Sequence, residues 1–328
     1  MEQLSIKGRI SSRAISFLLA TPNVCRSDSF KPVLVFKRIM LRVVFMFIFI
    51  FFCACVSDAQ EKRALLIGIG NYPIEGGWNV IHGSNDVVLI HKTLVSQGFQ
   101  EQNIKQLLDA EATYDNIVSS FQELLSVTNK NDVIYIQFSG HGQRITDIDG
   151  DEEDRFDESW IPYDAPKRYS KGIYEGEKHI TDDFLNEYLT KLRFRVGYGG
   201  KIIVIADACH SGSGSRGLGD DENVYKRGSS ETFVIPREPA NVIRKEKPVD
   251  WLFVAACKSY QSNYEYRDDQ GNYYGPLSFS IAKSESQLND IKYSDAIDIW
   301  GDIMREITIY PQDINDEGRP SKKNNNLF

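Results

Sequence analysis

Cysteine is scarce in this sequence, and no two cysteines form a CxxC pair. The five cysteines are Cys25, Cys53, Cys55, Cys209 and Cys257. The first three lie in an N-terminal region that we expect to fall outside the fold, and two widely spaced cysteines do not make a disulfide framework. The histidines also lack the spacing of zinc ligands, so a zinc site is not expected.

An excess of basic charge is missing as well. The chain has 38 Lys and Arg against 46 Asp and Glu, and the formal net charge is −8. Nucleic acids and anionic membranes need a basic face, so neither is an expected partner. The composition, with 41% apolar and 26% charged residues, is that of an ordinary globular protein, and the sequence has no internal repeat.

The apolar run at 43–55 has no charge but is too short to span a bilayer, which needs roughly 18–20 residues. Basic residues between 37 and 42 precede it, and small residues stand three and one positions before a cut after Ala59. This pattern is typical of a secretory signal peptide, here residues 40–59. It predicts a secreted or periplasmic protein.

Residues 1–39 precede that segment, and we expect translation to begin at Met40, which leaves 1–39 as an upstream extension. Two alternatives remain for the apolar run. It is an uncleaved membrane anchor, or Cys55 is a lipidated N-terminus, although Phe52-Cys53-Ala54 is a poor lipobox. A membrane contact is expected only in these two cases.

After residue 60, short apolar runs alternate with helical patterns. Strands are predicted at 63–70, 104–108, 132–138, 201–206 and 251–256, and helices at 85–98, 113–128, 181–192, 277–283 and 294–307. Asn85 and Thr181 are expected helix caps. Such alternation predicts an α/β fold with a mainly parallel sheet and helices on both faces. The stretch 211–248 is rich in Gly, Ser and charge, which indicates a flexible surface connection.

Two of these strands run directly into reactive residues. One continues into Ser-Gly-His141-Gly142 and the other into Asp-Ala-Cys209-His-Ser-Gly. Because the carboxyl ends of parallel strands meet at one edge, we expect His141 and Cys209 to lie close together. Taken alone, such a cysteine is usually a buried small hydrophobe and such a His-Gly pair a turn.

A thiol attacks a carbonyl only as thiolate, which a nearby imidazole can supply. The tetrahedral intermediate then needs hydrogen-bond donors, and the N–H groups of Gly142 and Cys209 are the natural candidates. The sequence therefore predicts a cysteine nucleophile, Cys209, with His141 as its general base and acid.

The ordered motifs SGHG, DGDEEDRFDE and DACHSG resemble those of a metacaspase, in the caspase-like peptidase family. The resemblance covers about residues 61–310, and DACHSG differs from the QAC-x-G motif of human-type caspases. It implies a caspase-like fold in one domain. The p20-like catalytic part would be 60–215, the flexible connection 216–247 and the p10-like part 248–328.

The resemblance also implies a cysteine endopeptidase that cleaves proteins or peptides after Arg or Lys, through a thioester acyl-enzyme. The matching substrate-binding positions are Asp86, Ser139 and Asp207. A buried carboxylate pair without a fixed basic partner is costly, and a substrate guanidinium would relieve that cost. The plainer interpretations are helix capping for Asp86 and a structural hydrogen bond for Asp207.

Family members often need calcium, and no other cofactor is expected. The matching positions are Asp157, Asp182 and Asp183, and such oxygen ligands suit Ca²⁺. A further family aspartate falls on Arg216 here, with Asp220 and Asp221 as alternatives. The run 147–154 resembles an EF-hand loop only superficially, and we interpret it as a solvated acidic loop.

Relatives often cleave themselves between the two parts. The basic pairs Lys226-Arg227 and Arg244-Lys245 lie in the predicted exposed connection and have the right residue type. Cys257 ends the last predicted strand, and we interpret it as structural or as a wall of the substrate cleft.

Three alternatives remain open. The chain could be another caspase-fold peptidase, such as a clostripain- or gingipain-like one. It could be a non-catalytic caspase-like module that binds partners, although such pseudoenzymes typically lose the His or the Cys. Without the signal peptide, it would be a cytosolic signalling protease.

Overall fold

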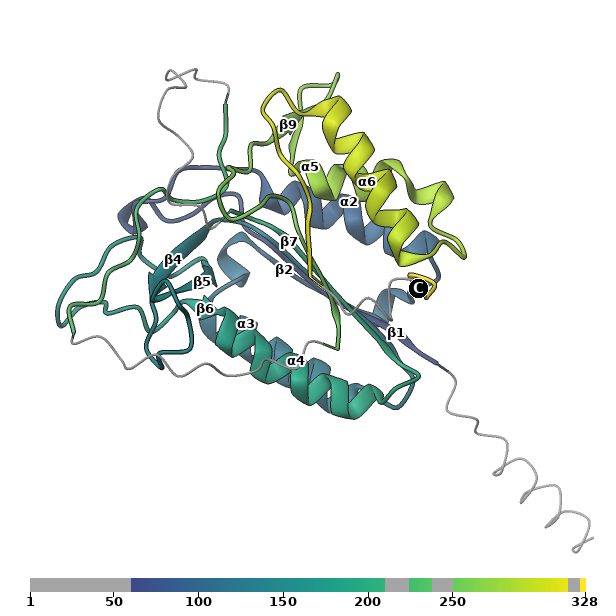
Figure 1. Cartoon of the computed structure of the whole chain (residues 1–328), viewed down its shortest axis with the longest axis horizontal. Coiled ribbons are helices and arrows are strands. Elements are labelled where there is room, and N and C mark those ends of the chain that lie inside the picture. Colours follow the sequence, from purple (N-terminus) through teal and green to yellow (C-terminus); the bar gives the residue numbers. More distant parts are fainter. Residues whose placement is uncertain (1–59, 210–223, 238–249, 318–324) are drawn as a thin grey trace, which may run out of the picture. The chain divides into compact units, whose positions relative to one another are not determined.

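A six-stranded sheet forms the centre of the fold, with the strand order β11-β8-β7-β3-β1-β2 (Figure 1). The structure, a computed structural model, describes residues 60–209, 224–237, 250–317 and 325–328. The strands of this sheet are β1 (Lys62–Gly68), β2 (Ile104–Leu108), β3 (Val133–Ser139), β7 (Lys201–Asp207), β8 (Leu252–Ala255) and β11 (Asn315–Glu317). Neighbours are parallel except β11, which is antiparallel to β8. The predicted α/β, mainly parallel arrangement is confirmed.

The two central strands, β3 and β7, are almost wholly buried, as continuous apolar sequence predicts for strands covered on both faces. They pair in register, with Ser139 opposite Asp207. Both therefore end at the same height along one edge of the sheet, and the residues that follow them begin side by side.

Five α-helices of the described residues cover the sheet in two layers (Figure 1). They are α2 (Gly83–Ser96), α3 (Tyr114–Val127), α4 (Asp182–Val196), α5 (Pro276–Lys283) and α6 (Tyr293–Ile307). α2, α5 and α6 bury their apolar residues in one core cluster, and α3 and α4 bury theirs in the other. The prediction of helices on both faces is confirmed.

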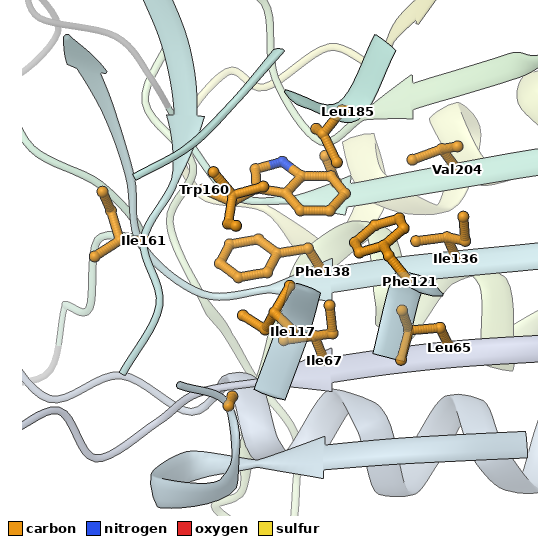
Figure 2. Packing of buried hydrophobic residues seen from close by; sticks show 14 of the residues in the cluster. Leu65, Ile67, Ile117, Phe121, Ile136, Phe138, Trp160, Ile161, Leu185 and Val204 are labelled. Carbon is orange, nitrogen blue, oxygen red and sulfur yellow. The ribbon is translucent and has the colours of Figure 1, made fainter. Parts of the chain in front are cut away.

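The core beneath α3 and α4 contains large aromatic side chains (Figure 2). Phe138, near the end of β3, stacks on Trp160 with ring centroids 4.8 Å apart. Burying such rings contributes about 1.5–3 kcal/mol each from area alone. The stack packs the end of β3, three residues before His141.

Two small sheets lie outside the central one. The first joins β4 (Gly142–Thr146), β5 (Phe156–Trp160) and β6 (Ile180–Thr181), and the second joins β9 (Tyr266–Arg267) and β10 (Tyr273–Tyr274). Short 3-10 turns span Ile74–Gly76, Glu101–Asn103, Asp109–Glu111 and Glu285–Gln287. The strand β5 was not predicted from the sequence.

Helix caps were predicted with mixed success. The Thr181 hydroxyl accepts the N–H of Phe184 at 3.3 Å, as expected of a cap. Asn85 lies inside α2, and its amide instead donates to the carbonyl of Tyr273 at 3.0 Å. The helix begins two residues earlier, so the Asn85 prediction was wrong.

Residues Asp58–Phe328 form one compact unit. The predicted upstream extension 1–39 and signal peptide 40–59 lie outside the described residues. Within the part that the structure describes, no helix combines the length and apolar character that crossing a membrane requires.

Candidate active site

The two predicted catalytic residues lie just beyond the ends of β3 and β7. His141 follows β3 by two residues, and Cys209 follows β7 by two. His141 is 2% exposed and Cys209 is fully buried. Because the two strands are parallel neighbours, the predicted dyad is brought to one edge of the sheet, at the carboxyl ends where α/β folds bind their ligands.

His141 is held on three sides. Its Nε2 lies 2.8 Å from the carbonyl oxygen of Asn79, and its ring stacks on Trp78 at 4.8 Å and packs against Tyr72 at 4.9 Å. A carbonyl oxygen only accepts, so we assign the proton to Nε2, which leaves Nδ1 as an acceptor. Burial lowers the pKa of His141 to about 4, against the opposing effect of the Asn79 hydrogen bond. The ring is therefore a neutral base at pH 7.

The Cys209 thiol donates to the carbonyl oxygen of Gln261 at 3.2 Å. Cys257 lies on the neighbouring strand end, and its contact with Cys209, followed by burial, raises its pKa well above the ordinary value. Cys257 lines a cavity of about 430 Å³, but neither His141 nor Cys209 lines it, so its role as a wall of the substrate cleft stays a prediction. The oxyanion role of the N–H groups of Gly142 and Cys209 stays a prediction.

The three residues predicted to bind a basic side chain are all fully buried near the ends of α2, β3 and β7. Their pocket already holds a cation. Arg227 Nη1 forms an ion pair with Asp86 and lies 3.6 Å from Asp207 Oδ1. Burial raises the pKa of Asp86 to about 6, and the Arg227 charge acts in the opposite direction.

Two further residues, Glu265 and Gly275, line this pocket, and the sequence analysis did not identify them. Glu265 places its Oε1 3.0 Å from both Nε and Nη2 of Arg227. Gly275 donates its N–H to Asp86 at 2.9 Å, and a Cβ at Gly275 would lie 2.2 Å from Asp207. Nothing larger than glycine therefore fits there without a shift.

Asp207 also makes the structural hydrogen bonds that its plainer interpretation predicts. Its Oδ1 accepts from Asn263 at 2.8 Å, and its Oδ2 accepts both the N–H and the hydroxyl of Ser278. Ser139 lies behind this arrangement, 3.5 Å from the Ser278 hydroxyl. The Asp207 carboxylate is thus fixed in place with one side turned to the cation.

The segment that carries Arg227 contacts the site through two isolated bridges, Lys226 with Tyr264 and Gly228 with Cys209. Arg227 N–H donates to Asn263 at 2.9 Å, and Glu265 N–H donates to the carbonyl of Tyr225 at 2.9 Å. The next residue, Gly228, donates its N–H to His141 Nδ1 at 2.9 Å. The peptide bond after Arg227 therefore lies at the dyad.

Gly228 has a backbone that other residues rarely adopt, with φ +139°. A Cβ there would lie 2.1 Å from the carbonyl oxygen of Cys209. Glycine is the residue that permits this close approach to the predicted nucleophile.

The prediction of a flexible, exposed connection was wrong for Arg227 and Phe233. Arg227 was expected in an exposed loop, yet it is fully buried, because the buried carboxylates of the pocket attract its guanidinium. Phe233 is also buried and pairs with β4. Lys226 is partly buried, and the pair Arg244-Lys245 lies outside the described residues.

The predicted calcium ligands lie away from this pocket, on β5 and at the start of α4. Carboxylate oxygens gather here in two groups, and within each group they lie within 4.8 Å of one another. One group is Asp147, Asp151 and Asp157, and the other is Asp149, Asp151 and Asp183. Asp182 is also close enough to raise the pKa of Asp157. The solvated interpretation of the acidic loop was wrong for Asp147 and Asp151, which are buried.

Asp157 fits a cation ligand. It is 3% exposed, and its buried Oδ1 has no hydrogen-bond partner. Burial, and then the neighbouring carboxylates, raise its pKa to about 8. Hard oxygen donors gathered in this way suit Ca²⁺. The family position at Arg216 and the alternatives Asp220 and Asp221 lie outside the described residues.

Comparison with known proteins agrees with the motifs. Residues 62–215 match the family model described as metacaspase, peptidase C14 domain. Metacaspase-7 of Arabidopsis thaliana is 36% identical over 161 residues, which are 47% of this chain and 35% of that protein. Metacaspase-1B of Aspergillus fumigatus is 31% identical over 285 residues, 74% of this chain and 65% of that protein. The chain thus spans between about a third and two thirds of these relatives.

A solved structure shares the fold. Protein GSU0716 from Geobacter sulfurreducens superposes with a TM-score of 0.55 at 18% identity, covering 82% of this chain and 98% of that one. Such a likeness shows the fold alone. Together with the family match, it agrees with the caspase-like architecture predicted from the motifs.

Proposed function

With residues 62–215 identified as a metacaspase-type peptidase C14 domain, we propose that this chain is a cysteine endopeptidase that cleaves after Arg or Lys. Cys209 is the nucleophile and His141 its base and acid. Protein or peptide substrates present a basic residue to the pocket formed by Asp86, Asp207 and Glu265.

One observation carries this proposal. The segment ending in Arg227-Gly228 lies in the site as a peptide substrate would, with its guanidinium on the buried carboxylates. The amide nitrogen that would become the leaving group already contacts His141, at 2.9 Å. A merely structural arginine needs the ion pairs but not this placement of the following peptide bond.

The geometry supports a sequence of proton transfers. His141 Nδ1 takes the thiol proton as the Cys209 sulfur attacks the carbonyl carbon and forms the C–S bond. The oxyanion is stabilised by the N–H groups of Gly142 and Cys209. His141 then gives its proton to the departing amine as the C–N bond breaks. Water, deprotonated by the same imidazole, hydrolyses the thioester and restores the thiol.

The same placement supports self-cleavage between Arg227 and Gly228. Of the two basic residues predicted there, Arg227 is the one whose side chain fills the pocket. Until that bond is cut, the segment occupies the position that a substrate would need. Self-cleavage would therefore both process the chain and open its site.

We also propose calcium as an activator. Asp147, Asp151, Asp157 and Asp183 supply the oxygen ligands, with Asp182 beside them. Bound calcium would neutralise these carboxylates. The acidic loop contacts the processed segment, since Arg237 donates to the backbone carbonyl of Asp147 at 3.2 Å, so ordering the loop would bear on that segment.

The apolar run and cleavage pattern at 40–59 support export to the periplasm or outside the cell. A membrane-bound form remains the alternative, through an uncleaved or lipidated segment. Fractionation of expressing cells distinguishes the two, because the exported form is soluble and begins at Gln60.

The test of the activity uses residues 60–328 and fluorogenic peptides that differ only in the residue before the cut. We expect hydrolysis with Arg and Lys, none with Asp, and none by Cys209→Ala. No hydrolysis of any peptide, with calcium and with added trypsin to cut the connection, would favour the non-catalytic module.

A further inference from the structure

Glu265 is a third carboxylate of the pocket, from a part of the chain remote in sequence from Asp86 and Asp207. It immediately precedes β9, and its side chain is fully buried. It lies at the Nε side of the Arg227 guanidinium, whereas Asp86 pairs with Nη1. The guanidinium thus lies between carboxylates that contact different nitrogens.

Glu265 is held in place by His82. The His82 N–H donates to Glu265 Oε1 at 2.7 Å, and its ring Nδ1 lies 2.6 Å from Oε2. A carboxylate accepts, so Nδ1 is the donor. The His82 ring is itself stacked on Tyr273 at 4.8 Å and meets Tyr225 edge-on at 4.6 Å. Burial favours the protonated acid, but Arg227 and then His82 lower the pKa of Glu265 below its ordinary value.

A lysine cannot satisfy this arrangement. Its side chain ends in a single nitrogen at the position of the arginine Cζ, one bond short of Nη1, and it has no nitrogen at Nε. An ammonium drawn toward Asp86 would leave Glu265 as a buried carboxylate without its cation. Because an unpaired buried charge is costly, the pocket favours the ion that contacts both sides.

We propose that the His82–Glu265 pair is a specificity element that makes the site prefer Arg over Lys. Glu265 contacts the substrate guanidinium, and His82 is a positioning residue that fixes the carboxylate. This inference rests on the proposed peptidase activity, and it adds a preference for Arg within the predicted Arg-or-Lys substrate class.

The test compares kcat/KM for two peptides that differ only in Arg or Lys before the cut, after self-cleavage is complete by mass. We expect the self-cleaved protein to prefer Arg at least tenfold. Loss of one charge-assisted hydrogen bond corresponds to about tenfold to hundredfold, so Glu265→Gln should lower the Arg/Lys ratio by at least about tenfold. The loss should fall mainly on KM, because the contact is with the bound side chain.

His82→Ala should lower the ratio in the same direction, and His82→Asn should restore most of it, because an Asn amide nitrogen can replace the ring Nδ1. A merely structural role would not produce this rescue. The control is Glu123→Gln, which removes an exposed carboxylate paired with Lys105 and should leave the ratio unchanged. If circular dichroism shows that Glu265→Gln does not fold, the Arg/Lys ratios of Glu265→Asp and of the His82 variants test the proposal instead.

The outcomes separate the two claims. An Arg/Lys ratio near one in the parent protein, or a ratio that Glu265→Gln and His82→Ala leave unchanged, overturns this inference but not the peptidase. Absence of hydrolysis with either peptide overturns the proposed function itself.

Discussion

Replacing Arg227 by Met tests whether the ion pairs of the pocket hold the uncut chain together. The change keeps the side-chain length but removes the charge, leaving Asp86, Asp207 and Glu265 buried without their cation. The Cys209→Ala background prevents self-cleavage from confusing the result.

The magnitude follows from burial. Breaking a fully buried ion pair by removing one partner costs about 3–5 kcal/mol of unfolding free energy, because the remaining charge is uncompensated. For a domain of this size, that corresponds to a fall in Tm of roughly 10 °C. Burial already raises the pKa of Asp86 to about 6 with Arg227 present, so the loss should shrink at pH 5, where the carboxylate takes up a proton.

The assay is urea unfolding followed by tryptophan fluorescence, with thermal melts at pH 5 and pH 8. The matched control is Arg168→Met, which breaks an exposed pair with Glu231 and should cost no more than about 1 kcal/mol. Equal losses for the two variants at pH 8 would refute the reasoning, because Arg227 would then contribute no more than a surface residue.

The remaining predictions concern self-cleavage and pH. Gly228→Ala should stop self-cleavage while leaving hydrolysis of peptides by trypsin-opened protein, because its Cβ would meet the Cys209 carbonyl at 2.1 Å; unchanged self-cleavage by gel would contradict this. The acid limb of the self-cleavage rate should follow the pKa of His141, about 4, and a midpoint near 6.5 would contradict it. Asp157 has a pKa of about 8 in the folded state, so its contribution to stability is present below pH 4 and lost as pH rises through 8. In thermal melts, calcium should remove this loss of stability at high pH. Asp157→Asn should show neither the loss at high pH nor an effect of calcium on it.

The sheet and the positions of His141 and Cys209 beyond two neighbouring strand ends could be predicted from sequence because both depend on local patterns. Continuous apolar runs gave the central strands, and motifs at their ends placed His141 and Cys209 together. The parallel register that aligns Ser139 with Asp207 then follows from strand pairing.

The occupant of the pocket could not be predicted in the same way. Arg227 lies in a stretch whose composition indicates exposure, and its burial depends on carboxylates far away in the sequence. The same applies to Glu265 and His82, which are 183 residues apart and have no motif of their own. The one available signal was the predicted buried carboxylate pair, Asp86 and Asp207, which needs a cation nearby. The sequence analysis assigned that cation to a substrate and not to Arg227.

The most direct test of the account is the intact mass of residues 60–328 incubated with calcium, beside Cys209→Ala. The account predicts that the parent chain gives two fragments, the second beginning at Gly228, and that Cys209→Ala stays whole. An uncut parent chain, or the same cut in Cys209→Ala, would contradict it.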